Sequence, residues 1–100
     1  MKVIIKAPNN PAVEAEIENT LEALQGIVGG YIECVPLTYE ALIICNEEGK
    51  LRGLLHNFNT PVDNIVGTVV ICGDEGEDFT DVPITVDEFN KILTEWGNEV

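Results

Sequence analysis

The chain has 100 residues and a formal net charge of −13, because 18 Asp and Glu residues outnumber 5 Lys and Arg residues. This length suits a single domain, residues 1–100, that buries a modest core without metal or disulfide support. The charge, with no extended basic stripe, argues against direct binding of nucleic acid. No apolar run approaches the roughly 18 residues of a membrane span.

The first predicted element is a β-hairpin. Residues 2–7 form a short apolar strand, and residues 8–11 hold the Pro and Asn residues of a turn. Residues 13–18 alternate between apolar and Glu side chains, which is the period of a half-buried strand. Because the opening apolar run is too short for a signal peptide, we expect a cytoplasmic protein.

A helix is predicted next, over residues 19–28. Asn19 can cap its free amide groups, and Glu22 stands three residues later, close to a capping box. Gly29 and Gly30 end this helix, because glycine accepts the left-handed conformation after a helix without steric cost.

Three further strands are predicted in the middle of the chain. Residues 31–35 and 41–45 are two of them, and a turn then leads to a third over residues 51–54, which completes a meander. Residues 65–72 are the most apolar run and predict a central strand, in which Gly67 marks a bulge or a close backbone approach.

A second helix is predicted after an acidic loop at residues 74–78. Thr85 and Glu88 match the Thr-x-x-Glu capping box, and apolar residues follow at helical spacing until Gly97. The whole pattern predicts an α+β domain. We expect a mainly antiparallel sheet of about five to six strands with two helices packed on one face.

The three cysteines, Cys34, Cys45 and Cys72, each lie inside or at the end of an apolar segment and form no Cys-x-x-Cys pair. A free cysteine packs as a small hydrophobic residue. We therefore expect three buried, unreactive thiols with no metal or redox role.

A basic cluster interrupts the acidic composition. Lys50, Arg52 and His56 fall within seven residues and are half of the six basic or imidazole side chains. On the predicted strand Lys50 and Arg52 point to one face, so with His56 they can bind a phosphate or carboxylate. Further candidate ligand-binding residues offer amides for the edge of a base or sugar and rings for stacking: Asn46, Asn57, Asn59, Tyr31, Tyr39 and Phe58.

The alternative is an edge strand whose protective charges pair with Glu47 and Glu48. Charged hydrogen bonds contribute about 1.5–3 kcal/mol each, so three give roughly 5–9 kcal/mol before ordering costs. Nanomolar binding needs about 12 kcal/mol. The cluster therefore needs aromatic stacking, amide hydrogen bonds or a second subunit of a homo-oligomer to retain a ligand.

The acidic end of the chain is a rival feature. Residues 74–100 carry nine acidic residues against Lys91 alone. Such a surface can imitate nucleic acid and attract a basic host protein, with an attraction that weakens as salt is added. The alternative is a surface that only keeps the protein soluble.

No catalytic or metal-binding signature accompanies these features. His56 is the only histidine, and one general base without a nucleophile does not make an active site. Residues 74–78 lack the spacing of a calcium loop. We therefore expect a protein that is not an enzyme and has no metal or cofactor.

Three runs, residues 19–33, 45–51 and 65–71, resemble the hallmarks of a small DUF3846-like family of uncharacterised domains, common in phages and mobile elements of bacteria. The resemblance covers about residues 1–75. It implies a shared fold and a genomic setting often enriched in inhibitors of host defence, with no assigned activity. For a phage protein, the expected location is the host cytoplasm.

Three functions stand as hypotheses. The first is a non-catalytic counter-defence protein that sequesters a small anionic, nucleotide-like ligand around Lys50, Arg52 and His56. The second is an acidic inhibitor that mimics nucleic acid and binds a basic host defence protein. The third is a structural or interaction module without a ligand.

Overall fold

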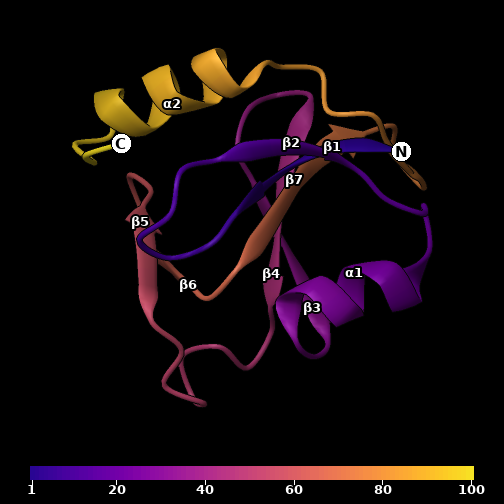
Figure 1. The fold of residues 1–100 in the computed structure, drawn as a ribbon, viewed down its shortest axis with the longest axis horizontal. Helices are drawn as coiled ribbons and strands as arrows, with labels where there is room; N and C mark the ends of the chain where they lie inside the picture. Colours follow the sequence, from indigo (N-terminus) through magenta and orange to yellow (C-terminus); the bar gives the residue numbers. More distant parts are fainter.

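The computed structural model describes residues 1–100 and contains eight strands and two helices (Figure 1). Neither helix has the length and apolar character needed to cross a membrane. The predicted α+β class is confirmed. In chain order the elements are β1 (Lys2–Lys6), β2 (Val13–Glu16), α1 (Leu21–Val28), β3 (Ile32–Pro36), β4 (Ala41–Asn46), β5 (His56–Asn59), β6 (Asn64–Val66), β7 (Val69–Asp74), β8 (Phe79–Thr80) and α2 (Val86–Glu95).

A six-stranded sheet forms the centre of the molecule. Its strands run in the order β2-β1-β7-β4-β3, with β8 also paired to β7, and every pair is antiparallel. Ile71 in β7 lies opposite Ile4 on one side and Ile43 on the other. The predicted hairpin of β1 and β2 is confirmed.

The two helices cover opposite faces of this sheet, so the prediction that both pack on one face is wrong (Figure 1). Phe89 of α2 packs on the face that includes Ile43, whereas Leu24 of α1 packs on the face that includes Ile44. Successive strand residues point to opposite faces. Because β4 and β7 are apolar on both, each face needs its own cover, as in sheets buried on two sides.

A two-stranded sheet of β5 and β6 adds to the α2 side of the core. Phe58 of β5 meets Phe89 of α2 edge to face, with ring centroids 5.8 Å apart. The predicted strand over residues 65–72 is therefore two strands, and Gly67 stands between them with φ of 75°. The amide of Gly67 donates to the carbonyl of Leu55 at 2.7 Å, so the predicted close backbone approach is confirmed, and a Cβ at Gly67 would lie 2.8 Å from Leu54 Cδ1.

The predicted strand over residues 51–54 is absent, and a coiled turn takes its place. The amide of Arg52 donates to the carbonyl of Glu48, and that of Leu54 donates to Gly49. The expected meander is therefore only the β3–β4 hairpin. Lys50 and Arg52 share no strand face.

The helix caps follow the sequence with one shift. The capping box of Thr85 and Glu88 in α2 is confirmed, since each side chain accepts from the other residue's amide. In α1 the cap is Thr20, which accepts from Ala23 at 3.1 Å. Asn19 instead donates to the carbonyl of Phe79.

Two of the three cysteines are buried and one is exposed. Burial raises the pKa of Cys45 to about 11 and that of Cys72 to about 12. The prediction is wrong for Cys34, because β3 is the last strand of the sheet and leaves this side chain exposed. Partial burial, then the charges of Asp74 and Glu33, also raise the pKa of Cys34.

We expect only Cys34 to react when the folded protein meets dithionitrobenzoate at about pH 8, below the ordinary thiol pKa of about 8.5. In denaturant all three thiols should react, and Cys34→Ser should leave no reactive thiol in the folded state. Absorbance of the released thiolate counts them. Rapid reaction of a second thiol in the folded protein would contradict the described packing.

Candidate functional site

The predicted cluster is dispersed over several unrelated contacts. Lys50 Nζ lies 2.5 Å from Asp63 Oδ1, and both side chains are about half exposed. The hydrogen bond from Lys50, then the amide of Asn64, hold the pKa of Asp63 below its usual value. Lys50 is therefore already paired, although with Asp63 rather than with Glu47 or Glu48.

Arg52 and Asn46 stabilise the C-terminal end of α1. Arg52 Nη1 donates to the carbonyl of Gly29 at 2.9 Å, and Asn46 Nδ2 donates to that of Val28 at 3.1 Å. These carbonyls have no partner within the helix, and a cation here is favourable beside the negative end of the helix dipole. A Cβ added at Gly30 would lie 2.9 Å from Asn46 Nδ2 and 3.2 Å from Arg52 Nη1. This packing gives both side chains a structural role.

His56 and Asn59 lie at the two ends of β5. His56 Nε2 is 3.0 Å from Asn59 Oδ1 in an exposed position. The side chain of Asn98 accepts from the amide of Asn59 and donates to its carbonyl, at 2.7 and 2.8 Å. Asn59 thus ties β5 to the segment after α2.

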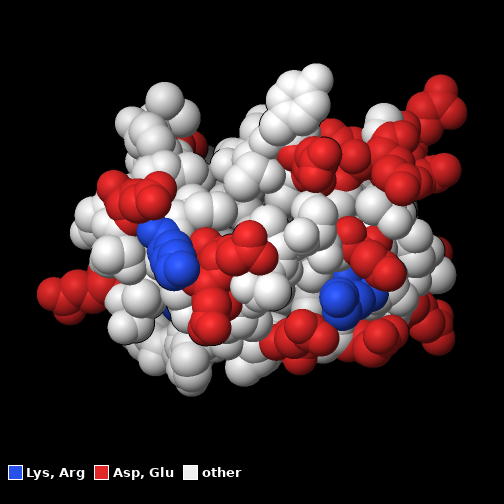
Figure 2. All heavy atoms as spheres, turned by 90° about the horizontal axis from the view of Figure 1, so that it is seen from above, with Lys and Arg blue, Asp and Glu red and all other residues white.

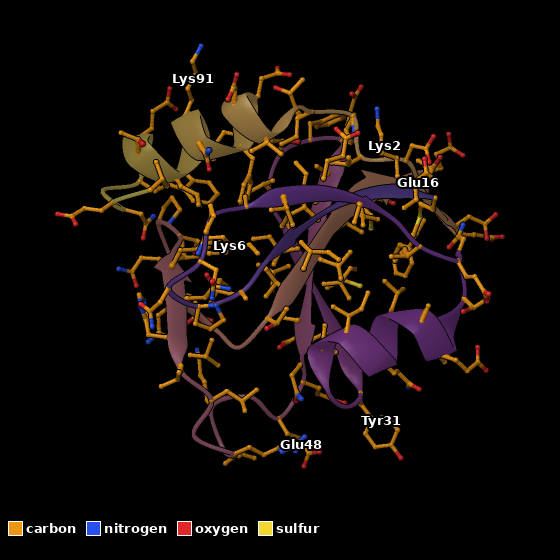
Figure 3. The ribbon with its side chains drawn as sticks, in the orientation of Figure 1. Lys2, Lys6, Glu16, Tyr31, Glu48 and Lys91 are labelled. Carbon is orange, nitrogen blue, oxygen red and sulfur yellow. The ribbon has the colours of Figure 1, made fainter.

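The aromatic candidates do not converge on these residues. Phe58 is 1% exposed and packed in the core, so its predicted stacking on a ligand is wrong. Tyr31 is 66% exposed and projects from the end of the molecule near Glu48 (Figure 3). Tyr39 is fully exposed in the turn between β3 and β4. None of them closes over the basic residues.

A hollow of about 230 Å³ does border Lys50 and Asn46. Its charged lining also includes Glu33, Glu47 and Asp63. Three carboxylates against one ammonium group disfavour an anion here. The described residues include no group of three or more His, Cys, Asp or Glu placed to hold a metal ion.

The largest hollow lies elsewhere, with a volume of about 420 Å³, among the β1–β2 turn, β5 and α2. We call it the Lys6 cleft. Of the predicted ligand-binding residues, only Asn57 reaches it. Nine residues line it, four of them asparagines around one lysine: Lys6, Asn9, Asn10, Pro11, Ala12, Asn57, Asn90, Glu99 and Val100.

Lys6 is 8% exposed and lies between β1 and β5 (Figure 3). Its Nζ donates to the carbonyl of Ala7 at 2.9 Å and to Asn57 Oδ1 at 3.0 Å. The ion pairs of the molecule are those of Met1 with Glu16 and Lys50 with Asp63, so Lys6 has no carboxylate partner. Burial lowers the pKa of Lys6. A buried cation without a counter-ion is costly unless hydrogen bonds or a ligand compensate it.

Asn57 forms hydrogen bonds with both the side chain and the backbone of Lys6. Its Nδ2 donates to the carbonyls of Lys6 and Gly67, each at 2.8 Å, while its Oδ1 accepts from Lys6 Nζ. The irregular backbone at Gly67 thereby becomes part of the support for the cleft.

One signal for this site is present in the sequence, although the predicted cluster did not include it. Lys6 stands two residues after Ile4, so in a strand both side chains point to the same face, and Ile4 is a core residue. However, a lysine at the end of a short strand is more simply interpreted as an exposed terminal residue. Its burial depends on β5, whose position is not visible in the sequence.

The chain matches the family model described as Domain of unknown function (DUF3846) over residues 1–94. The chain belongs to this family. The DUF3846 match extends beyond the three runs noted in the sequence and includes nearly all of α2. No curated protein and no solved structure matches the chain. Membership of DUF3846 thus confirms the resemblance and assigns no activity.

We expect Lys6→Met to remove a pH-dependent part of the stability. The pKa of Lys6 is lowered from 10.5, so between the lowered pKa and 10.5 the unfolded chain holds a proton that the folded protein has lost. The free energy of unfolding should therefore rise with pH in this window, relative to that of Lys6→Met. Urea denaturation at neutral and alkaline pH measures the difference.

The matched control for this experiment is Lys91→Met, which removes the same charge from an exposed position on α2 that points away from the cleft (Figure 3). The buried thiols of Cys45 and Cys72 have the opposite effect. Their pKa values are raised in the folded protein, so the free energy of unfolding falls as pH rises above the thiol pKa of the unfolded chain. Both thiols are present in wild type, Lys6→Met and Lys91→Met, so their contribution cancels when the three pH curves are compared. Parallel pH curves for wild type and Lys6→Met would contradict the burial of a charged Lys6.

Proposed function

We propose that this protein is a non-catalytic binding protein that holds one small anionic, nucleotide-like ligand in the Lys6 cleft. The observation that carries the proposal is a buried lysine without a carboxylate partner in the largest hollow of an acidic molecule. An ammonium group has three N–H donors. Two reach Ala7 and Asn57, which leaves the third for an oxygen of the ligand.

The amides of the cleft support recognition of a polar ligand. The side chains of Asn9 and Asn90 line it, and neither takes part in a hydrogen bond within the protein. A volume of about 420 Å³ lies at the lower end of the range for small-molecule sites, about 300–1,000 Å³. The cleft therefore suits one nucleotide-sized ligand.

Magnitudes limit the affinity of this site. One charged hydrogen bond contributes about 1.5–3 kcal/mol and a neutral one about 0.5–1.5 kcal/mol. One of the former and three of the latter sum to roughly 3–8 kcal/mol, no tighter than about micromolar. No aromatic side chain lines the cleft to add stacking. Tighter retention requires a second subunit that closes over it.

A counter-defence role by sequestration in the host cytoplasm is part of this proposal. Its support is the genomic setting that the resemblance implies, together with a cleft of a size that suits capture of a small ligand. Sequestration acts by mass action, so at micromolar affinity the protein must be abundant or oligomeric. Native mass spectrometry reports both the oligomeric state and any retained ligand.

Isothermal titration with nucleoside monophosphates and cyclic nucleotides tests the binding. We expect Lys6→Met to weaken the best ligand by about 10–100-fold, the worth of one charged hydrogen bond. Lys91→Met should change the affinity less than about twofold, because exposed charges are screened. The absence of heat with every ligand, or equal affinity in Lys6→Met, would reject the proposal.

A second candidate function, an acidic inhibitor of a basic host protein, is favoured by the surface itself. Acidic side chains cover much of the face seen in Figure 2, and only small basic patches lie among them. On α2, Asp87, Glu88 and Glu95 are all exposed. Such a surface attracts a cationic partner at a distance.

Pull-down from host lysate distinguishes this second function. A basic partner should be recovered at low salt and lost at high salt, and Asp87→Asn with Glu95→Gln should recover less of it. Lys6→Met should recover as much as the wild type, because the cleft is a separate feature. If the protein recovers no partner at any ionic strength, the inhibitor hypothesis is rejected.

A further inference from the structure

The hydrogen bonds of Lys6 suit a neutral amine as well as an ammonium group. An amine has two N–H groups and one lone pair. The two acceptors of Lys6 Nζ, the carbonyl of Ala7 and Asn57 Oδ1, match its two N–H groups. The lone pair of such an amine has no protein partner, because Lys6 Nζ makes no other hydrogen bond.

Burial without an ion pair favours this neutral form at Lys6. Glu99 is the only acidic side chain that lines the cleft, and no carboxylate lies within ion-pair distance of Lys6. Asn57 on β5 and Asn90 on α2 offer neutral amides. This burial lowers the pKa of Lys6. Desolvated lysines of this kind are the ones that act as nucleophiles toward carbonyl groups.

We propose that the Lys6 amine captures small polar aldehydes in the cleft as an imine. The lone pair of Nζ forms a bond to the carbonyl carbon, and the carbonyl oxygen leaves as water with the two protons of the amine. No oxidant or reductant is required. The product can take up one proton, and its N–H can again donate to Ala7 or Asn57.

The free amides complete the site for such a ligand. Asn9 and Asn90 border the same hollow as Lys6, so their donors and acceptors can bind the polar groups of the aldehyde. The inference rests on the proposed binding role of the cleft. It differs in the protonation state that it uses, because an anion requires the ammonium form and an imine requires the amine.

Site-mapped reductive labelling tests the inference on the unaltered protein. Wild type is incubated with propionaldehyde or glyoxylate and cyanoborohydride at near-neutral pH, and modified lysines are quantified by peptide mass spectrometry. We expect Lys6 to be labelled faster than Lys91, with a rate that rises with pH. Accessibility alone predicts the opposite order, since Lys6 is 8% exposed and Lys91 is exposed.

In denaturant the advantage of Lys6 should disappear, because the contacts with Asn57 and Ala7 are lost. Labelling of Lys91 and Lys2 with an unmodified Lys6 in the folded protein would overturn the inference. Equal rates in folded and denatured protein would overturn it as well.

The two proposals for the cleft can fail separately. Lys6→Arg keeps a cation but forms no imine, so it should retain anion binding and lose labelling at this position. Anion binding that weakens in Lys6→Met, together with an unlabelled Lys6, rejects the imine and leaves the proposed function standing. Rapid labelling of Lys6 with no binding of any anion does the reverse, and both measurements on wild type are independent of how the variants fold.

Discussion

The structure depends on a central strand that is buried on both sides. Val69, Val70, Ile71 and Cys72 of β7 are all 0% exposed. No one-sided sheet can bury them, so α1 must cover one face and α2 with the small β5–β6 sheet must cover the other. Burial of apolar surface on this scale is the main force that favours folding. The two layers are therefore a requirement of β7 itself.

The burial of Lys6 follows from the same constraint. β1 pairs with β7, and the register places Lys6 opposite Val69. The side chain of Lys6 therefore meets the layer that β5 provides, where Asn57 accepts from its Nζ. A cleft forms there because the cover of this face is incomplete between the β1–β2 turn and α2. The cost of a partly desolvated charge is typical of sites where function opposes stability.

Local chemistry was predictable from the sequence where it is decided by neighbours along the chain. The alternation in residues 13–18 identified a strand, and Thr85 with Glu88 identified a helix start. What failed depends on contacts distant in sequence. Continuous apolar runs such as residues 41–45 carry no information on which helix covers which face. The turn at residues 51–54 depends on Gly49, where a Cβ would lie 2.9 Å from Val66 of β6.

The candidate site was misplaced for the same reason. A cluster in sequence suggested a cluster in space, yet Lys50 and Arg52 each found a separate structural partner, Asp63 and Gly29. Lys6 stood alone in the sequence and gained its surroundings from β5 and α2. In this acidic protein, the informative cation is the buried one that forms no ion pair. That property belongs to the fold, because it depends on which acids are kept away.

The end of α1 carries a consequence for variation within the DUF3846 family. A Cβ at position 30 would require the ends of the Asn46 and Arg52 side chains to shift, and both of those side chains donate to the carbonyls that end the helix. A larger residue at position 30 therefore moves the Asn46 amide and the Arg52 guanidinium away from the carbonyls of Val28 and Gly29. Through these contacts, a change at one of the three positions alters the fit of the other two.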